Sequence, residues 1–179
     1  MIVYLINALT LSRIAIAIII FILLMLNSSY LLALILFFIA GLTDYLDGFL
    51  ARKYNAKSQI GEILDPISDK ILITFLFFAL TVNLSSYLIG FAGAVIIARE
   101  IWVSALRDFN SRNNNSNATK VIYIAKIKTT AQLFTIFLYL FSLAFNVMLL
   151  ILVADIFLII SLLITIYTGY LYTINTFNN

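Results

Sequence analysis

The sequence predicts an all-α, polytopic membrane protein with six transmembrane helices. Of its 179 residues, 64% are hydrophobic and only 11% are charged, and the mean hydropathy is +1.11. A soluble domain has about a quarter of charged residues, so this chain lacks the charge to cover a surface that faces water. In lipid, backbone groups must be satisfied within helices or a closed barrel. The apolar runs are long and continuous rather than short and alternating, which favours helices.

Six apolar segments are each long enough to span a bilayer, which takes roughly 20 residues. They cover residues 5–26, 30–51, 62–82, 87–109, 121–145 and 149–173. The connections at 27–29, at 83–86 and around Asn146 are short and uncharged, whereas those at 52–57 and 107–128 carry lysines and arginines. Because such residues mark the cytoplasmic side, we expect both termini in the cytoplasm, in a bacterial-type inner membrane. Residues 1–179 are expected to form one domain.

The first segment carries a polar stripe. Asn7, Thr10 and Arg13 recur at every third residue, so they lie on one side of a helix. The stripe has two interpretations. In one, it is the polar face of an amphipathic helix whose Arg13 side chain reaches the membrane interface. In the other, it faces a polar site inside the protein.

Carboxylates are concentrated where the second segment ends and the third begins. Asp44 and Asp47 are three residues apart, so they lie on one face of a helix. Asp65 and Asp69 are four residues apart and share a face in the same way. The short connection at 52–57 makes the two helices antiparallel, which brings both pairs to a similar depth near the cytoplasmic side.

Four carboxylates at this depth are costly unless cations neutralise them. Oxygen ligands suit Mg²⁺, Mn²⁺ or Ca²⁺, and four carboxylates are enough to bridge two ions, an arrangement common in phosphoryl transfer. The chain has no cysteine and no histidine, which disfavours zinc. The alternative is a set of salt bridges with the basic residues Arg52, Lys53, Lys57 and Lys70.

Small residues follow the first acidic pair. Gly48 directly follows Asp47, Ala51 lies one turn further along, and Arg52 ends the segment. Glycine inside a helix costs about 1 kcal/mol relative to alanine. Gly48 therefore indicates a close approach, either of a nucleotide or of another helix, and Arg52 is placed to meet a phosphate.

The stretch from Asp44 to Asp69 reads DYLDGFLAR, eight further residues, and then GEILDPISD. This pattern resembles the signature of the CDP-alcohol phosphatidyltransferase family, with every defining position at the right spacing. The resemblance implies the six-helix CDP-alcohol phosphotransferase fold, a homodimer and a two-metal site on the cytoplasmic side. Segments at 7–13, 98–100, 103–108 and 126–132 resemble the bacterial phosphatidylglycerophosphate synthase branch of the family. One departure is Ile6, where that branch often has proline.

The resemblance also implies roles for individual residues. The metal ligands would be Asp44, Asp47, Asp65 and Asp69, holding two divalent cations, Mg²⁺ or Mn²⁺. Asp69 would also be the general base. The contacts to the CDP moiety would come from Thr43, Gly48, Ala51, Arg52 and Gly61. The substrates would be CDP-diacylglycerol and glycerol 3-phosphate, in contact with membrane lipids, and we expect no nucleic-acid partner.

Basic residues of the fourth and fifth segments suit glycerol 3-phosphate, which is a dianion near neutral pH. The candidates for binding its phosphate are Arg99, Arg107, Lys126 and Lys128. Arg99 lies inside an apolar run, where a charge without a partner is expensive. Its neighbour Glu100 is expected to point elsewhere on the helix, so the alternative partner is an aspartate of the metal cluster. For Lys128, the alternative is a contact with lipid headgroups.

Together with these basic residues, the resemblance implies transfer of the phosphatidyl group to glycerol 3-phosphate, which gives phosphatidylglycerophosphate and CMP. One alternative is a related enzyme with another acceptor alcohol. Another is a divalent-cation transporter, because carboxylates within a membrane also mark ion pathways. Against the transporter, the aspartates lie near one membrane face rather than at the midplane.

The remaining sequence predicts no further site. The polar segment 110–117 is expected to be a loop. After Lys128 the only charged residue is Asp155, so we expect the last two segments to be scaffold or dimer surface.

Overall fold

The computed structural model describes residues 2–54, 59–113 and 123–178, without the side chains of residues 59, 62, 123, 125 and 126. Its elements are α1 (Ile2–Met25), α2 (Tyr30–Lys53), α3 (Gln59–Asn83), α4 (Tyr87–Arg112), α5 (Tyr123–Phe145) and α6 (Leu149–Phe177). The described residues contain no strand. Five of these helices are long and apolar enough to cross a membrane, and α3 is not among them. The all-α, polytopic membrane architecture is therefore confirmed.

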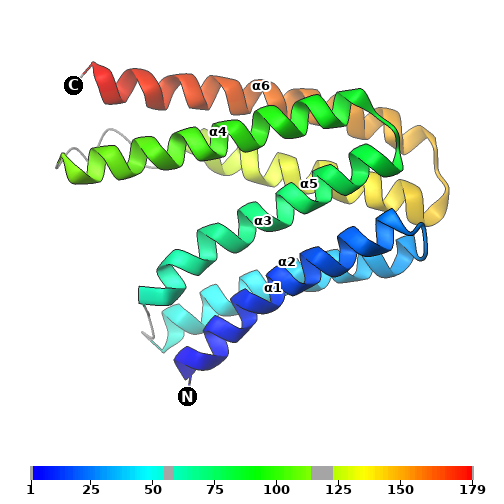
Figure 1. The fold of residues 1–179 in the computed structure, drawn as a ribbon, viewed down its shortest axis with the longest axis horizontal. Coiled ribbons are helices and arrows are strands. Elements are labelled where there is room, and N and C mark those ends of the chain that lie inside the picture. Colours follow the sequence, from blue (N-terminus) through cyan, green and yellow to red (C-terminus); the bar gives the residue numbers. More distant parts are fainter. Residues whose placement is uncertain (1, 55–58, 114–122, 179) are drawn as a thin grey trace.

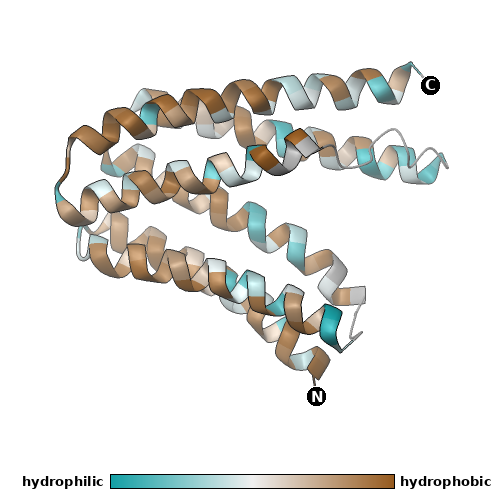
Figure 2. Ribbon diagram, turned by 180° about the vertical axis from the view of Figure 1, so that it is seen from behind, coloured by the Kyte–Doolittle hydropathy of each residue, from teal (hydrophilic) through white to brown (hydrophobic). Residues whose placement is uncertain are grey.

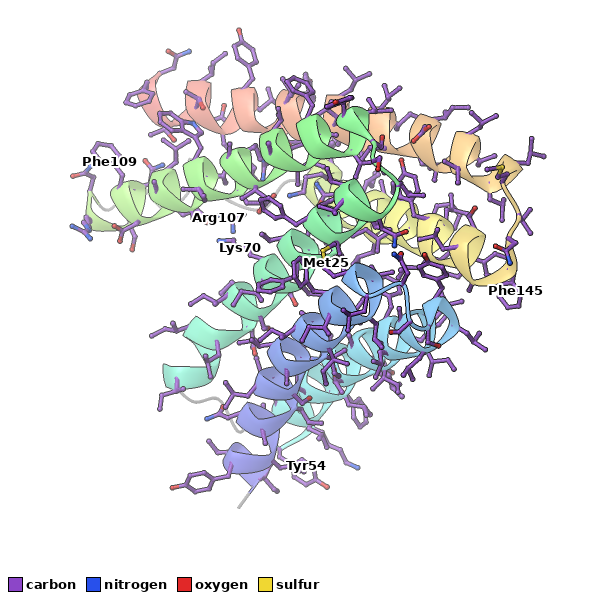
Figure 3. The ribbon with its side chains drawn as sticks, turned by 45° about the vertical axis from the view of Figure 1, so that its right-hand side comes forward. Met25, Tyr54, Lys70, Arg107, Phe109 and Phe145 are labelled. Carbon is purple, nitrogen blue, oxygen red and sulfur yellow. The ribbon has the colours of Figure 1, made fainter. Side chains whose placement is uncertain are left out.

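The six helices form a bundle that opens at one end. α1 packs against α2 and α3, α6 packs against α4 and α5, and contacts of α2 with α5 and of α3 with α4 join the two halves. The halves lie together at the three short turns and diverge toward the end that carries both termini (Figure 1). We call these the narrow end and the wide end. In Figure 3, Phe145 marks the narrow end, and Tyr54 and Phe109 lie on the two diverging halves at the wide end.

Each turn at the narrow end contains one residue in the left-handed region. These are Asn27, Ser85 and Asn146, with φ of 49°, 48° and 55°, and asparagine tolerates this conformation better than most residues. The Asn83 amide donates to the Asn27 side-chain oxygen at 2.6 Å, which ties the first turn to the second. The predicted short turns are confirmed.

The core fills the narrow half of the bundle. Its fully buried members include Ile20, Leu76, Leu80, Ile136 and Leu140. In the view of Figure 2, hydrophobic colouring dominates this half, and most hydrophilic segments gather toward the wide end. Because apolar packing closes one end only, the other end is left for polar groups.

Two details at the wide end differ from expectation. α4 continues to Arg112, so the polar segment begins as helix rather than as loop, and residues 114–122 lie outside the described residues. Asn110 is 1% exposed and donates to the Thr176 hydroxyl at 2.8 Å, which extends the contact between α4 and α6. The α2–α3 connection predicted at 52–57 is shortened because α2 extends to Lys53, and residues 55–58 are not described.

Candidate active site

Three of the four signature aspartates surround a buried arginine at the wide end. Arg13 of α1 is 1% exposed, and its guanidinium contacts the carboxylates of Asp44, at 2.8 Å, and of Asp47 and Asp69. The side chain of Asp47 is buried as well, whereas those of Asp44 and Asp69 are about half exposed. Their paired spacing on antiparallel helices therefore brings the carboxylates together, as the sequence predicts.

Thr10, one turn before Arg13, links the fourth aspartate to this group. Its hydroxyl lies 3.1 Å from a carboxylate oxygen of Asp47 and 3.0 Å from one of Asp65, and Thr10 is fully buried. The polar stripe of α1 therefore faces a polar site. The alternative interpretation, in which Arg13 reaches the membrane interface, is wrong because its side chain points into the bundle. We call the aspartates at positions 44, 47, 65 and 69 the acidic cluster.

The acidic cluster has the donor chemistry that hard divalent cations require. All its potential ligands are carboxylate oxygens, and three carboxylates already converge on one positive charge. Within the described ranges, no three acidic side chains are arranged as a ready-formed metal site. The positive charge between these carboxylates belongs to Arg13. Arg13 was not among the basic residues of the salt-bridge interpretation. The residues fit a cation, while the role of each aspartate as a metal ligand stays a prediction.

A cavity of about 650 Å³ lies between α3, α4 and α5, next to the acidic cluster. Its charged lining residues are Asp69, Lys70, Arg99, Glu100, Arg107 and Lys128. With four positive and two negative charges, the lining has a net charge of +2, which suits a dianion. Figure 3 shows Lys70 and Arg107 facing the space between α3 and α4. We call this the basic cavity.

Arg99 is held at the wall of the basic cavity by neighbours on two helices. It is 9% exposed, its Nη1 donates to Glu100 Oε1 at 3.2 Å, and its Nη2 donates to the Thr168 hydroxyl of α6 at 2.8 Å. The expectation that Glu100 points away from Arg99 is wrong. Both side chains are long enough to bend toward each other, and Glu100 is drawn the same way because it also accepts from Lys128 of α5.

The other predicted phosphate-binding residues divide into three cases. Lys128 is 4% exposed and pairs with Glu100, so it points into the protein rather than toward lipid headgroups. Arg107 is exposed at the cavity wall, with its guanidinium carbon 5.8 Å from the centre of the Tyr172 ring. The side chain of Lys126 lies outside the described residues.

The residues expected to contact CDP lie on α2 and at the start of α3. A Cβ atom at Gly48 would meet only Arg52 of its own helix, at 3.8 Å. Among the described residues, no atom of another helix lies within 4 Å of that Cβ position, which favours the interpretation that Gly48 leaves room for a ligand. Thr43 and Ala51 are half-buried on the same helix, and Gly61 is buried near the start of α3.

A second cavity, of about 450 Å³, has a mainly apolar lining. Its large apolar residues are Phe37, Phe38, Leu42, Tyr45, Leu72, Ile73 and Leu133, from α2, α3 and α5. Asp44 and Asp69 line it too, and Asp69 also lines the basic cavity. Asp69 therefore lies at the junction between an apolar cavity and a basic one.

The profile of the CDP-alcohol phosphatidyltransferase family matches residues 3–167. This chain belongs to that family. Relatives include the CDP-diacylglycerol–glycerol-3-phosphate 3-phosphatidyltransferases of Escherichia coli strain K12, Shigella flexneri serotype 5b and Shigella sonnei. Each is 39% identical over 101 residues, which is 56% of this chain and 56% of the relative, so the match spans about half the length of these relatives. The family uses divalent cations, in agreement with the oxygen-only acidic cluster.

Sequence reasoning missed the contacts that α6 makes with Arg99, a residue of the basic cavity wall. Buried polar residues share one face of the helix, namely Ser161, Thr165, Thr168, Tyr172 and Thr176. Gln132 of α5 donates to the Thr165 hydroxyl at 3.2 Å, so the face binds α5 as well as Arg99. The spacing of these residues by three and four positions could have predicted a polar face on this helix. The signal is ambiguous, because hydroxyl groups in a membrane helix can also bond to the backbone of their own helix.

Replacing Arg13 with glutamine tests the electrostatic role of this residue. Arg13→Gln removes the cation that contacts three carboxylates, and breaking a buried ion pair costs about 3 kcal/mol or more. We expect a clearly lower unfolding temperature in detergent with a chelator present. Mn²⁺ should raise it more than in the unmodified protein, because the ion supplies the missing charge.

The matched control is Arg112→Gln. Arg112 and Asp108 form an ion pair at 2.7 Å, but their side chains are 76% and 61% exposed, and exposed pairs contribute about 0–1 kcal/mol. Equal unfolding temperatures for the two variants would contradict the central role of Arg13.

Proposed function

We propose that this protein transfers the phosphatidyl group of CDP-diacylglycerol to glycerol 3-phosphate, with release of CMP and phosphatidylglycerophosphate. The observation that carries the proposal is the position of Asp69. Its carboxylate belongs to the acidic cluster and lines both the apolar and the basic cavity. A reaction between a lipid and an anionic alcohol needs such a junction, because the two substrates have opposite solvation requirements.

The acidic cluster is the proposed site for the diphosphate of the donor. Asp44, Asp47, Asp65 and Asp69 would hold two divalent cations there, Mg²⁺ or Mn²⁺, which supply positive charge to the diphosphate and to the leaving group. The open surface at Gly48, with Arg52 beside it, is the proposed support for the cytidine nucleotide. Thr43, Ala51 and Gly61 are proposed to complete this part of the site. The apolar cavity offers a surface for the lipid portion of the donor.

The basic cavity is the proposed acceptor site. A phosphate dianion matches its net charge of +2, and guanidinium groups bind phosphate oxygens through paired hydrogen bonds. Arg99, Arg107 and Lys128, together with Lys126, would fix the phosphate so that the acceptor hydroxyl lies near Asp69. Holding both reactants in place supplies much of the rate enhancement in such reactions.

The proposed chemical step is a displacement at phosphorus. Asp69 accepts the proton of the acceptor hydroxyl, and the hydroxyl oxygen forms a bond to the phosphorus that carries diacylglycerol. The bond between that phosphorus and the bridging oxygen breaks, and CMP leaves with the electron pair. A carboxylate is the available base because the chain contains no histidine.

Another phosphorylated alcohol would also match the charge of the basic cavity, whereas an uncharged alcohol or serine would leave Arg99 and Lys128 without an anionic ligand. The transporter alternative is less well supported. Side chains such as Leu76, Leu80 and Leu140 fill the narrow half of the bundle below the acidic cluster.

The proposal includes an orientation and an assembly. The wide end, with both charged connections, would face the cytoplasm at the inner membrane, where the nucleotide-linked donor and the soluble acceptor meet. The whole chain would act as one domain and pair as a homodimer.

CMP release by the purified protein in detergent tests the function. With CDP-diacylglycerol and Mg²⁺ or Mn²⁺, we expect release that requires glycerol 3-phosphate and stops when a chelator removes the metal. Release with a different alcohol only would keep the chemistry and overturn the acceptor. Metal uptake into liposomes without any CMP release, compared with empty liposomes, would favour the transporter.

Asp69→Asn tests the proposed base. The change keeps the size of the side chain and removes its ability to accept the proton, so we expect turnover to fall by at least about 10²-fold. The unfolding temperature in detergent should fall less than in Arg13→Gln, because Asp69 is half exposed and Arg13 keeps its contacts with Asp44 and Asp47. Normal turnover in the folded variant would refute the assignment.

Gly48 substitutions separate the two interpretations of this residue. Gly48→Ala should stabilise α2 by up to about 1 kcal/mol, and no neighbouring helix stands in the way. We expect the KM for CDP-diacylglycerol to be lowest in the unmodified protein, higher in Gly48→Ala and highest in Gly48→Leu. The unfolding temperature should not decrease in the same order. If Gly48→Leu lowers the unfolding temperature and leaves this KM unchanged, the packing interpretation is correct instead.

A further inference from the structure

Three residues on one face of α6 contact Arg99, each in a different way. Thr168 accepts a hydrogen bond from Arg99 Nη2 at 2.8 Å. Gly169 lies against the stem of the same side chain, and Tyr172 places its ring 5.5 Å from the guanidinium carbon. Thr168 and Tyr172 are completely buried. None of these three residues lines the basic cavity, so α6 supports Arg99 from behind.

Gly169 determines how closely Arg99 can approach α6. A Cβ atom at this position would lie 3.0 Å from Arg99 Cγ and 3.6 Å from Nε. This is closer than ordinary van der Waals contact, so an alanine would displace the arginine stem by a few tenths of an ångström. Because the guanidinium is bonded at both ends, to Glu100 and to Thr168, this displacement would be passed on to the phosphate-binding atoms.

Tyr172 brings two cations to one ring. The guanidinium carbons of Arg99 and Arg107 lie 5.5 Å and 5.8 Å from its centre, within the range of a cation–π contact. Two like charges repel each other, and the negative face of the ring offsets part of that repulsion. The ring thereby holds both arginines at one wall of the basic cavity.

One donor atom of Arg99 lies on the α6 side of the side chain. This atom, Nε, is buried and, in the part of the chain that is described, has no hydrogen-bond partner. A buried donor without a partner is energetically unfavourable. The Nε lies 3.6 Å from the Cβ position at Gly169, so close packing against α6, rather than a hydrogen bond, holds this part of Arg99.

We propose that Thr168, Gly169 and Tyr172 of α6 are positioning residues that set the affinity for the phosphate of the acceptor. They act through Arg99 and Arg107 and do not touch the substrate. The proposal rests on the proposed function, because it assigns the phosphate of the acceptor to the basic cavity. It makes α6 a determinant of acceptor binding rather than scaffold alone.

Gly169→Ala tests the proposal, with Gly90→Ala as the matched control. A Cβ at Gly90 would lie equally close, 3.0 Å, to a side-chain atom of Thr81, but at the narrow end of the bundle. Alanine favours a helix over glycine in both variants, so a weakened helix cannot explain a loss. In Gly169→Ala we expect the KM and the calorimetric Kd for glycerol 3-phosphate to rise on the order of tenfold. The KM for CDP-diacylglycerol should stay within about twofold of the Gly90→Ala value.

Two substitutions at Tyr172 provide a second test. Tyr172→Phe keeps the ring and should leave the Kd for glycerol 3-phosphate within about twofold, whereas Tyr172→Leu removes the ring and should raise it several-fold. Circular dichroism and the unfolding temperature of each variant identify any that fails to fold, and the Gly169→Ala result then decides.

The outcomes separate the two proposals. If the unmodified protein binds glycerol 3-phosphate but releases no CMP, the proposed function fails, while a weaker Kd in Gly169→Ala still supports the positioning role. If the unmodified protein turns over and Gly169→Ala matches Gly90→Ala in KM and Kd, the function stands and the role of α6 is overturned. Equal losses for both substrates in Gly169→Ala would also overturn it, because they indicate a general packing defect.

Discussion

A buried arginine among carboxylates is the interaction on which the wide end of the bundle depends. Four aspartates in a chain with so few charges would repel one another and resist burial. Arg13, supported by Thr10, offsets that repulsion from a third helix. The packing of α1 against both α2 and α3 brings this one guanidinium to aspartates on two helices.

The shape of the bundle converts this charge distribution into a site. Apolar packing closes the narrow end, where a hydrogen bond ties the first turn to the second, and the helices diverge where the charges lie. Divergence leaves the basic cavity beside α4 and α5 and the apolar cavity beside α2 and α5. The acidic cluster lies where the two cavities meet. In the proposed reaction, the lipid donor and the anionic acceptor would therefore approach one carboxylate from separate surroundings.

The parts of this arrangement that the sequence predicted are those governed by local spacing. Helix positions follow from apolar run length, and the pairing of Asp44 with Asp47 follows from helical periodicity. The contact between Arg99 and Glu100 was predicted wrongly, because helical direction alone ignores how far long side chains bend toward a shared partner, here Lys128. The α6 contacts were missed, since the spacing of its hydroxyl residues marks a polar face but does not say which helix that face meets.

The incomplete pairing of the basic cavity bears on function rather than on stability. Arg99 and Lys128 share one carboxylate, Glu100. This carboxylate lowers the cost of burying both cations, but the three side chains together keep a net charge of +1. Arg107 adds another positive charge at the same wall. A fully neutral network would be more stable without ligand and would offer an anion little gain. Partial neutralisation by Glu100, together with the ring of Tyr172, lowers the cost of burying these cations while preserving their attraction for a dianion.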